Sequence, residues 1–170
     1  MTRAKMKKSP AAQLEPPRFE DTETLLIAGF RSHYISDTMD QIPSLWQRFG
    51  AHIGSVPGQI GRKTYGLCWT HGKEPGIDYL VGVEVSSSSG LPKEFTTATI
   101  PAQRCAVFQH RGHVSKLYET CEAISEWFPE SGYQGARGAA DAPDFFERYT
   151  EEFNPQTGLG GIEVWVPIKS

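Results

Sequence analysis

The stretch "IEVWVPIK" (162–169) decides the fold. In an extended chain, successive side chains point to opposite faces, so this stretch predicts a strand with two different faces. One face takes the branched aliphatic residues: Ile162, Val164, Val166 and Ile168. The other face takes Glu163 beside Trp165, and a tryptophan is unusual on a bare solvent face. We interpret the second face as the lining of a site, with a solvent-facing glutamate as the alternative.

Outward from this strand, the same order of elements occurs twice. Strand patterns and helix patterns alternate as strand–helix–strand–strand on each side of the serine-rich joint 86–92. The first unit comprises 22–34, 42–53, 63–70 and 78–85; the second comprises 95–111, 114–128, 144–153 and 162–169. The sequence thus predicts an α+β fold, with repeat halves of about 18–86 and 95–169 related by a pseudo-twofold axis. A ligand pocket would lie at its centre.

Each expected helix carries an apolar stripe at helical spacing. The first stripe is Ile42, Leu45, Trp46, Phe49 and Ile53, with Asp40 as N-cap and Pro43 in the first turn. The second stripe is Val114, Leu117, Tyr118, Cys121, Ile124 and Phe128. Both stripes predict helices that cover one face of a sheet.

A faint echo relates the two halves, because "LVGVEV" (80–85) can be laid on "EVWVPI" (163–168). Leu80 then takes the place of Glu163, and Gly82 takes that of Trp165. We expect an asymmetric cleft, in which the second half supplies the carboxylate and the indole while Gly82 leaves room.

Composition is that of an ordinary globular protein, with 38% hydrophobic and 22% charged residues. No apolar run is long enough to span a membrane, and no secretory signal follows the basic N-terminus. Three widely spaced cysteines and no CxxC pair argue against disulfides and zinc, so we expect a cytoplasmic protein.

Charge is unevenly distributed along the chain. Residues 1–17 carry four basic groups and one acidic group, and we expect them to form a disordered basic tail. The remaining residues, 18–170, carry 13 basic and 19 acidic groups, a net charge of −6. Such a body has no electrostatic reason to hold a nucleic-acid backbone, so direct nucleic-acid binding is not expected.

Three stretches carry a family resemblance: "IPAQRCAVFQHRGHVSKLYETCEAISEWFPESGY" (100–133), "PDFFERYTEEF" (143–153) and "IEVWVPIK" (162–169). Together with "IPSLWQRF" (42–49), "TYGLCW" (64–69) and "DYLVGVEV" (78–85), they resemble the GyrI-like small-molecule-binding domain, also known as the AraC effector-binding domain. The resemblance covers about residues 18–170. It implies tandem repeats with a central, multidrug-binding type of pocket that contains a glutamate, and Glu163 is the residue similar to it.

The resemblance also has departures. Cys105 stands where many relatives carry an aromatic residue, which alters the expected shape of the pocket. No helix-turn-helix pattern occurs, so we do not expect a complete one-chain transcription factor with its own DNA-binding domain. Family members serve as sensors of transcription regulators, as gyrase inhibitors and, in a few cases, as hydrolases of strained natural products.

Six residues are the expected ligand contacts: Glu163, Trp165, Tyr149, Tyr65, Trp69 and Glu147. A carboxylate beside aromatic rings suits a cation. Glu147 and Tyr149 share one strand face, which could be either cleft or core, and Tyr149 could relay a proton to Glu163. Partial burial is expected to raise the pKa of Glu163. His110 and His113 lie at a strand end rather than on one helix face, so no metal site and no cofactor is expected.

Three functional hypotheses follow. The first is a stand-alone module for sensing or sequestration, which binds a small hydrophobic ligand that is cationic or amphipathic. The second is a hydrolase of strained or electrophilic natural products, with Glu163 as general acid or base and Tyr149 as its helper. The third is an inhibitor of a protein partner such as a topoisomerase, or a partner of a separate regulator, acting through an acidic surface.

Overall fold

A single antiparallel sheet of eight strands forms the centre of the protein. The computed structural model describes residues 14–70, 75–136 and 141–169. The strands follow the order β1-β6-β8-β7-β3-β4-β2-β5. Their bounds are β1 (Arg18–Asp21), β2 (Leu25–Tyr34), β3 (Gln59–Trp69), β4 (Ile77–Val85), β5 (Thr96–Ile100), β6 (Arg104–His110), β7 (Phe145–Tyr149) and β8 (Ile162–Pro167).

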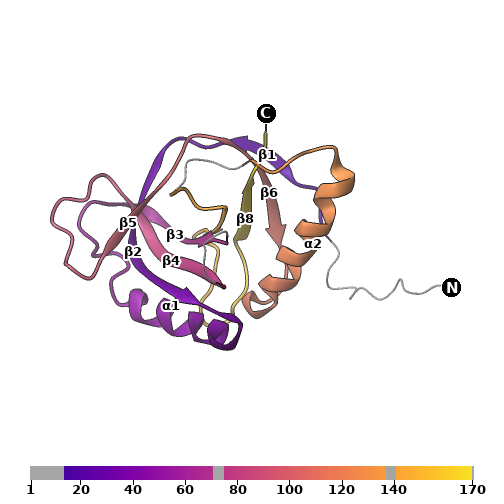
Figure 1. Ribbon diagram of the computed structural model, residues 1–170. Coiled ribbons are helices and arrows are strands. Elements are labelled where there is room, and N and C mark those ends of the chain that lie inside the picture. Colours follow the sequence, from indigo (N-terminus) through magenta and orange to yellow (C-terminus); the bar gives the residue numbers. More distant parts are fainter. Residues whose placement is uncertain (1–13, 71–74, 137–140, 170) are drawn as a thin grey trace.

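Two helices pack on one face of the sheet, which we call the outer face. Helix α1 (Ile42–Gly50) follows the 3-10 helix η2 (Ser36–Gln41), and α2 (Leu117–Ser131) follows η3 (Val114–Lys116). Figure 1 shows α1 against β2 and β4, and α2 beside β6 and β8. Leu45 and Phe49 of α1 and Leu117 and Ile124 of α2 are buried there. The opposite, inner face carries a separate apolar cluster of its own.

The strand order distributes the two halves of the sequence in a regular way. Strands β3, β4 and β2 of the first half lie together, as do β6, β8 and β7 of the second half, and β3 pairs with β7 at the junction. The remaining two strands are exchanged. Strand β1 of the first half pairs with β6, and β5 of the second half pairs with β2. Each half therefore completes the sheet of the other.

The predicted strands are confirmed, with corrected ends. The last strand runs from Ile162 to Pro167, and Ile162, Val164 and Ile168 lie in the outer-face core as expected. The expected strand 95–111 is two strands, β5 and β6, which are separated along the chain at Pro101, a residue without a backbone N–H to donate. The expected strand 144–153 ends at Tyr149.

The helix predictions need three corrections. Asp40 is part of η2, so the N-cap of α1 is Gln41, while Pro43 lies in the first turn as expected. Ile53 lies beyond the end of α1 and is exposed. In α2 the buried stripe includes Thr120 and not Tyr118, which is exposed. Val114 lies in η3, whose turns are tighter than those of an α-helix. Helical spacing counted from Val114 therefore does not identify the buried residues of α2.

Part of the N-terminal segment packs against the outer-face core. Of the segment 1–17, residues 1–13 lie outside the described residues, whereas Leu14 packs against the outer-face core and Glu15 forms an ion pair with Arg111. In the described ranges, no helix has the length and apolar character needed to cross a membrane.

Candidate functional site

A row of inner-face residues crosses the middle of the sheet at the level of Glu163. Glu163 on β8 lies opposite Gln109 on one side and Arg148 of β7 on the other. Arg148 in turn lies opposite Tyr65 of β3. Because the three residues Glu163, Arg148 and Tyr65 occupy paired positions on adjacent strands, their side chains project from the same face. We call Glu163, Arg148, Tyr65, Trp165 and Arg18 the inner-face site.

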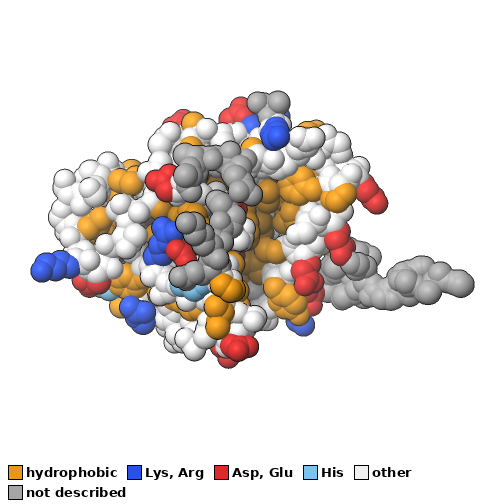
Figure 2. All heavy atoms as spheres, in the orientation of Figure 1, with side chains coloured by type: hydrophobic (Ala, Val, Ile, Leu, Met, Phe, Trp, Pro, Cys, Tyr) orange, Lys and Arg blue, Asp and Glu red, His pale blue; other side chains and the backbone are white. Residues whose placement is uncertain are grey.

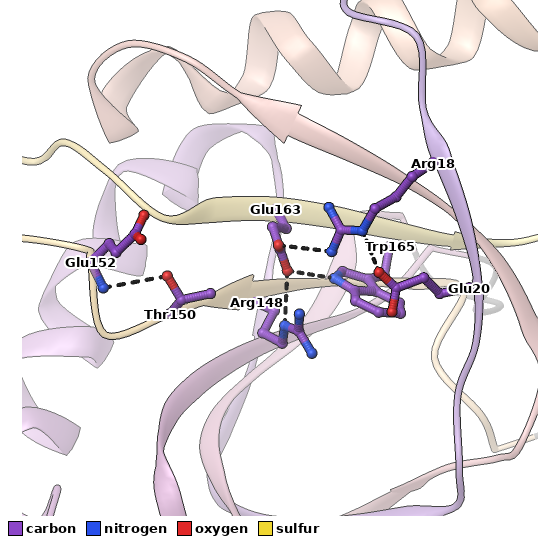
Figure 3. A network of polar contacts seen from close by, with 7 residues as sticks. All are labelled: Arg18, Glu20, Arg148, Thr150, Glu152, Glu163 and Trp165. Carbon is purple, nitrogen blue, oxygen red and sulfur yellow. Dashed lines mark hydrogen bonds and ion pairs between the residues drawn. The ribbon is translucent and has the colours of Figure 1, made fainter.

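Glu163 is buried and accepts hydrogen bonds from three side chains. Its Oε1 atom accepts from Arg148 Nε at 2.8 Å and from Trp165 Nε1 at 3.0 Å. Its Oε2 atom accepts from Arg18 Nη2 at 2.9 Å. Figure 3 shows the two arginines approaching the carboxylate from different strands, with Trp165 beside it. The carboxylate is thus held in one orientation by charged and neutral donors together.

These contacts determine the charge of Glu163. Burial alone would raise the pKa of this carboxyl, but the hydrogen bonds from Trp165 and Arg18 and the charge of Arg148 outweigh it and lower the pKa below its ordinary value. The expectation of a raised pKa is therefore wrong. Glu163 is an ionised carboxylate at neutral pH, which suits attraction of a cation and does not suit donation of a proton.

Trp165 forms the aromatic wall beside this carboxylate. Its ring stacks on Phe146, with centroids 5.6 Å apart and an interplanar angle of 15°. The guanidinium groups of Arg148 and Arg18 lie 4.5 Å and 5.7 Å from the Trp165 centroid. Both guanidinium groups thus lie near the indole ring while each is paired with the Glu163 carboxylate.

Tyr65 and Trp69 lie on the inner face as well. Both belong to the same apolar cluster as Trp165 and Phe146, together with Cys105 of β6. Trp69 donates its indole N–H to the backbone oxygen of Asp141, and Arg31 lies 3.8 Å over its ring. Since Trp69 follows Tyr65 by four residues along β3, it lies roughly 13 Å further from the row that holds Glu163.

Glu147 and Tyr149 lie on the outer face, away from Glu163. Glu147 Oε1 accepts hydrogen bonds from Tyr79 at 2.6 Å and from Tyr149 at 2.9 Å, and Trp46 of α1 donates to the Tyr79 hydroxyl at 3.2 Å. We call these four residues the outer-face cluster. Tyr149 therefore does not form the expected relay to Glu163, because it points to the other side of the sheet. The role of Glu147 and Tyr149 as ligand contacts stays a prediction.

Gly82 has a different role from the one expected. A Cβ atom at this position would lie 2.5 Å from the backbone oxygen of Ala28 and 2.8 Å from a methyl carbon of Ile27. The glycine thus permits close approach of β2 to β4, and the space beside it is filled. Leu80, which the echo lays on Glu163, lies on the inner face, and the repeat itself stays a prediction.

Sequence reasoning did not single out the two arginines of the site. The alternation of "FFERY" places Arg148 on the face opposite Glu147, so this signal was present once the two faces were distinguished. Arg18 gave no such signal, because its approach to Glu163 depends on the pairing of β1 with β6. Among the described residues, no group of three or more His, Cys, Asp or Glu side chains is arranged to hold a metal ion.

On the surface seen in Figure 2, hydrophobic side chains gather in a band over β6 and β8.

Residues 15–169 match the GyrI-like small-molecule-binding domain. The chain belongs to the GyrI-like family. The fold, the carboxylate on β8 and its aromatic neighbour agree with a domain that binds small molecules.

Among curated proteins, the chain is similar to the transcriptional regulator BrlR of Pseudomonas aeruginosa, with 28% identity over 134 residues. The match covers 76% of this chain but 47% of the regulator, so this chain spans less than half of that protein.

Among solved structures, it resembles SAV2435 bound to tetraphenylphosphonium, with a TM-score of 0.72, 21% identity and coverage of 92% of this chain and 95% of the other. It also resembles a putative bacterial transcription regulation protein from Staphylococcus aureus MU50, with a TM-score of 0.65, 19% identity and coverage of 91% and 98%. At these identities the likeness shows a shared fold.

Proposed function

We propose that this GyrI-like domain binds small hydrophobic cations at the inner-face site. The observation that carries the proposal is the buried, ionised carboxylate of Glu163, held beside the indole ring of Trp165. Coulomb attraction and contact of a cation with an aromatic face both favour a positively charged aromatic or amphipathic ligand. The structure of SAV2435 with tetraphenylphosphonium supports the same chemistry in a protein of this fold.

We further infer that the site lies beside a pseudo-twofold axis through the sheet. At the β3–β7 junction, Tyr65 pairs with Arg148 and Leu67 pairs with Phe146, on either side of the central pair Gly66 and Glu147. A twofold rotation about that pair would exchange the two halves, and it would place Leu80 where Glu163 lies. The ligand would then be bound asymmetrically, since one half alone supplies a carboxylate.

The biological role would be sensing or sequestration of such compounds in the cytoplasm. Relatives that are regulators support a sensing role, in which this domain reports to a DNA-binding partner. The thiols are consistent with a reducing compartment. Burial raises the pKa of Cys105 to about 12, and charges of Asp21 and Glu20 act in the same direction, so this thiol is poorly reactive.

The proposal is tested by isothermal titration calorimetry with tetraphenylphosphonium as the probe. Wild-type protein is expected to bind it, and Glu163→Gln is expected to lose at least about tenfold in affinity, because an ion pair with a buried carboxylate is lost. Glu147→Gln is the matched control: it neutralises the other buried glutamate, on the opposite face, and should leave the affinity within about twofold of wild type.

The result separates three outcomes. Equal loss in both variants would place the ligand elsewhere than the inner face, and loss in Glu147→Gln alone would move the site to the outer-face cluster. If the folded wild type binds neither tetraphenylphosphonium nor the neutral triphenylphosphine oxide, the proposed function is wrong. Circular dichroism of each variant ensures that lost binding is not lost folding.

A further inference from the structure

Arg18 has the position and the chemistry of a bound cation. Its guanidinium donates to Glu163 Oε2 at 2.9 Å and lies 5.7 Å from the centroid of the Trp165 ring. A hydrophobic cation at the inner-face site would need the same oxygen and the same aromatic ring. The protein's own side chain and such a ligand therefore compete for one place.

The other arginine of the site is held much more firmly. Arg148 lies directly opposite Glu163 in the β7–β8 ladder, and its side chain is 20% exposed. Strand β7 has a neighbour on each side, so the backbone at Arg148 is fixed by two ladders. Arg148 is consequently a permanent part of the site.

Arg18, in contrast, reaches the site from the edge of the sheet. Strand β1 has four residues and a single neighbour, β6, which separates it from β8. Arg18 lies opposite Val107, and Val107 lies opposite Trp165, so the side chain must extend across a whole strand to meet Glu163. Its side chain is 42% exposed, and it can turn outward into solvent without crossing the core.

A second carboxylate lies ready for Arg18 when it leaves Glu163. The Nε atom of Arg18 is paired with Glu20, two residues further along β1, and the Glu20 side chain is 41% exposed. In Figure 3, Arg18 lies between the two carboxylates. Loss of the contact with Glu163 would leave the guanidinium hydrated and still paired, which keeps the cost of its displacement low.

We propose that Arg18 is a built-in competitor that sets the selectivity of the site: hydrophobic cations bind by displacing its guanidinium from Glu163. The inference rests on the proposed function and adds a minimum strength of interaction that a ligand must exceed in order to bind. Only ligands whose charge and aromatic surface together exceed the contacts of Arg18 are retained, whereas small hydrated cations are excluded. Neutral ligands gain nothing from removing Arg18, because they offer no replacement charge to Glu163.

The test compares the affinity of four proteins for tetraphenylphosphonium and for the neutral probe triphenylphosphine oxide. Arg18→Met keeps the apolar stem but removes the charge, and is expected to bind the cation about three- to fivefold more tightly than wild type, the scale of a partly exposed ion pair. Arg18→Lys keeps the charge but loses the fork that contacts Glu163 and Glu20 together, so its affinity for the cation should lie between those of wild type and Arg18→Met. Affinity for the neutral probe should change less than about twofold in both variants.

Arg104→Met is the matched control. Arg104 lies on β6 next to β1, its side chain is 43% exposed, and it pairs with Asp21 of β1 without touching Glu163. If Arg104→Met tightens cation binding as much as Arg18→Met does, the effect comes from the net charge of this edge and the proposal is overturned. Unchanged or weaker cation binding by Arg18→Met, in a series in which wild type binds, overturns it as well and leaves the proposed function standing.

One remaining outcome is also decisive. Absence of cation binding in both wild type and Arg18→Met, with the proteins folded, would reject the cation site itself together with this inference. The two failures are thus distinguished by whether wild type binds.

Discussion

Glu147 and Glu163, the glutamates that are buried within the described part of the chain, have opposite electrostatic environments. Glu163 has arginine and indole donors, which lower its pKa. Glu147 is surrounded by hydroxyl groups and apolar side chains; burial raises its pKa, and the hydrogen bonds from Tyr79 and Tyr149 do not cancel that effect. One glutamate is therefore kept charged, and the other is shifted toward its neutral form.

The pH dependence of ligand binding follows from the first of these environments. Because the pKa of Glu163 is below its ordinary value of 4.5, the carboxylate stays ionised from pH 8 down to pH 5. Affinity for tetraphenylphosphonium is expected to vary by less than about twofold over that range. Calorimetric titration at four pH values checks this, and a decline that sets in between pH 6 and 7 would contradict the assignment of a lowered pKa.

The pH dependence of stability follows from the second. Since the folded-state pKa of Glu147 is raised above 4.5, the folded protein holds a proton that the unfolded chain has already released. The contribution of Glu147 to the free energy of unfolding therefore falls as the pH rises from about 4.5 through the folded-state pKa. Glu147→Gln has no such proton, so its stability relative to wild type should increase with pH in that window.

Urea unfolding of both proteins between pH 4 and pH 7 measures this difference. Glu163→Gln serves as a comparison of opposite sign. The pKa of Glu163 is lowered, so the stabilisation from this carboxylate is present above pH 4.5 and is lost as the pH falls through its folded-state pKa. A constant difference between Glu147→Gln and wild type would mean that Glu147 titrates normally.

At the scale of elements, the close approach of β2 and β4 sets the shape of the inner face. Gly29 and Gly82 are paired across the two strands, and a Cβ atom at Gly29 would lie 1.7 Å from the backbone oxygen of Val81. We expect Gly29→Ala to destabilise the protein by roughly 3 kcal/mol, because the clash is with backbone that cannot rotate away. Thermal unfolding should show a melting temperature about 6–12 °C lower.

Gly50→Ala provides the contrast for that experiment. Gly50 is the last residue of α1, and a Cβ atom there has no neighbour within 4 Å. Its substitution should change the free energy of unfolding by less than about 1 kcal/mol. Similar effects of the two substitutions would show that the strands separate to accept a side chain at Gly29.

The elements were largely predictable from local patterns, and the site only in part. Alternation identified β8 and both of its faces, including the place of Glu163 beside Trp165. It could not say that Tyr149 faces away from Glu163, because the relative orientation of two strands depends on their register. It also could not find Arg18, whose contact with Glu163 arises from two successive strand pairings far apart in sequence.

At the scale of the whole molecule, the exchange of β1 and β5 makes the halves interdependent. Strand β1 belongs to the first half but extends the sheet of the second, and β5 does the reverse. The two halves are also joined directly by the β3–β7 ladder. If one half unfolded alone, the other half would lose an edge strand and its pairing at the β3–β7 ladder, so neither half is expected to stay folded by itself.

We therefore predict a single cooperative unfolding transition for both halves. Trp46 and Trp69 report on the first half, and Trp127 and Trp165 report on the second. One variant keeps its tryptophans in the first half and has phenylalanine at both tryptophan positions of the second half, and the other variant is the reverse. In each variant, the urea midpoint followed by fluorescence should coincide with the midpoint followed by circular dichroism. Separate midpoints would show that the halves unfold independently, although the inner-face site takes Arg18 and Tyr65 from the first half and Glu163 from the second. Coincident midpoints would mean that occupation of the inner-face site stabilises the entire sheet, including strands that the ligand does not touch.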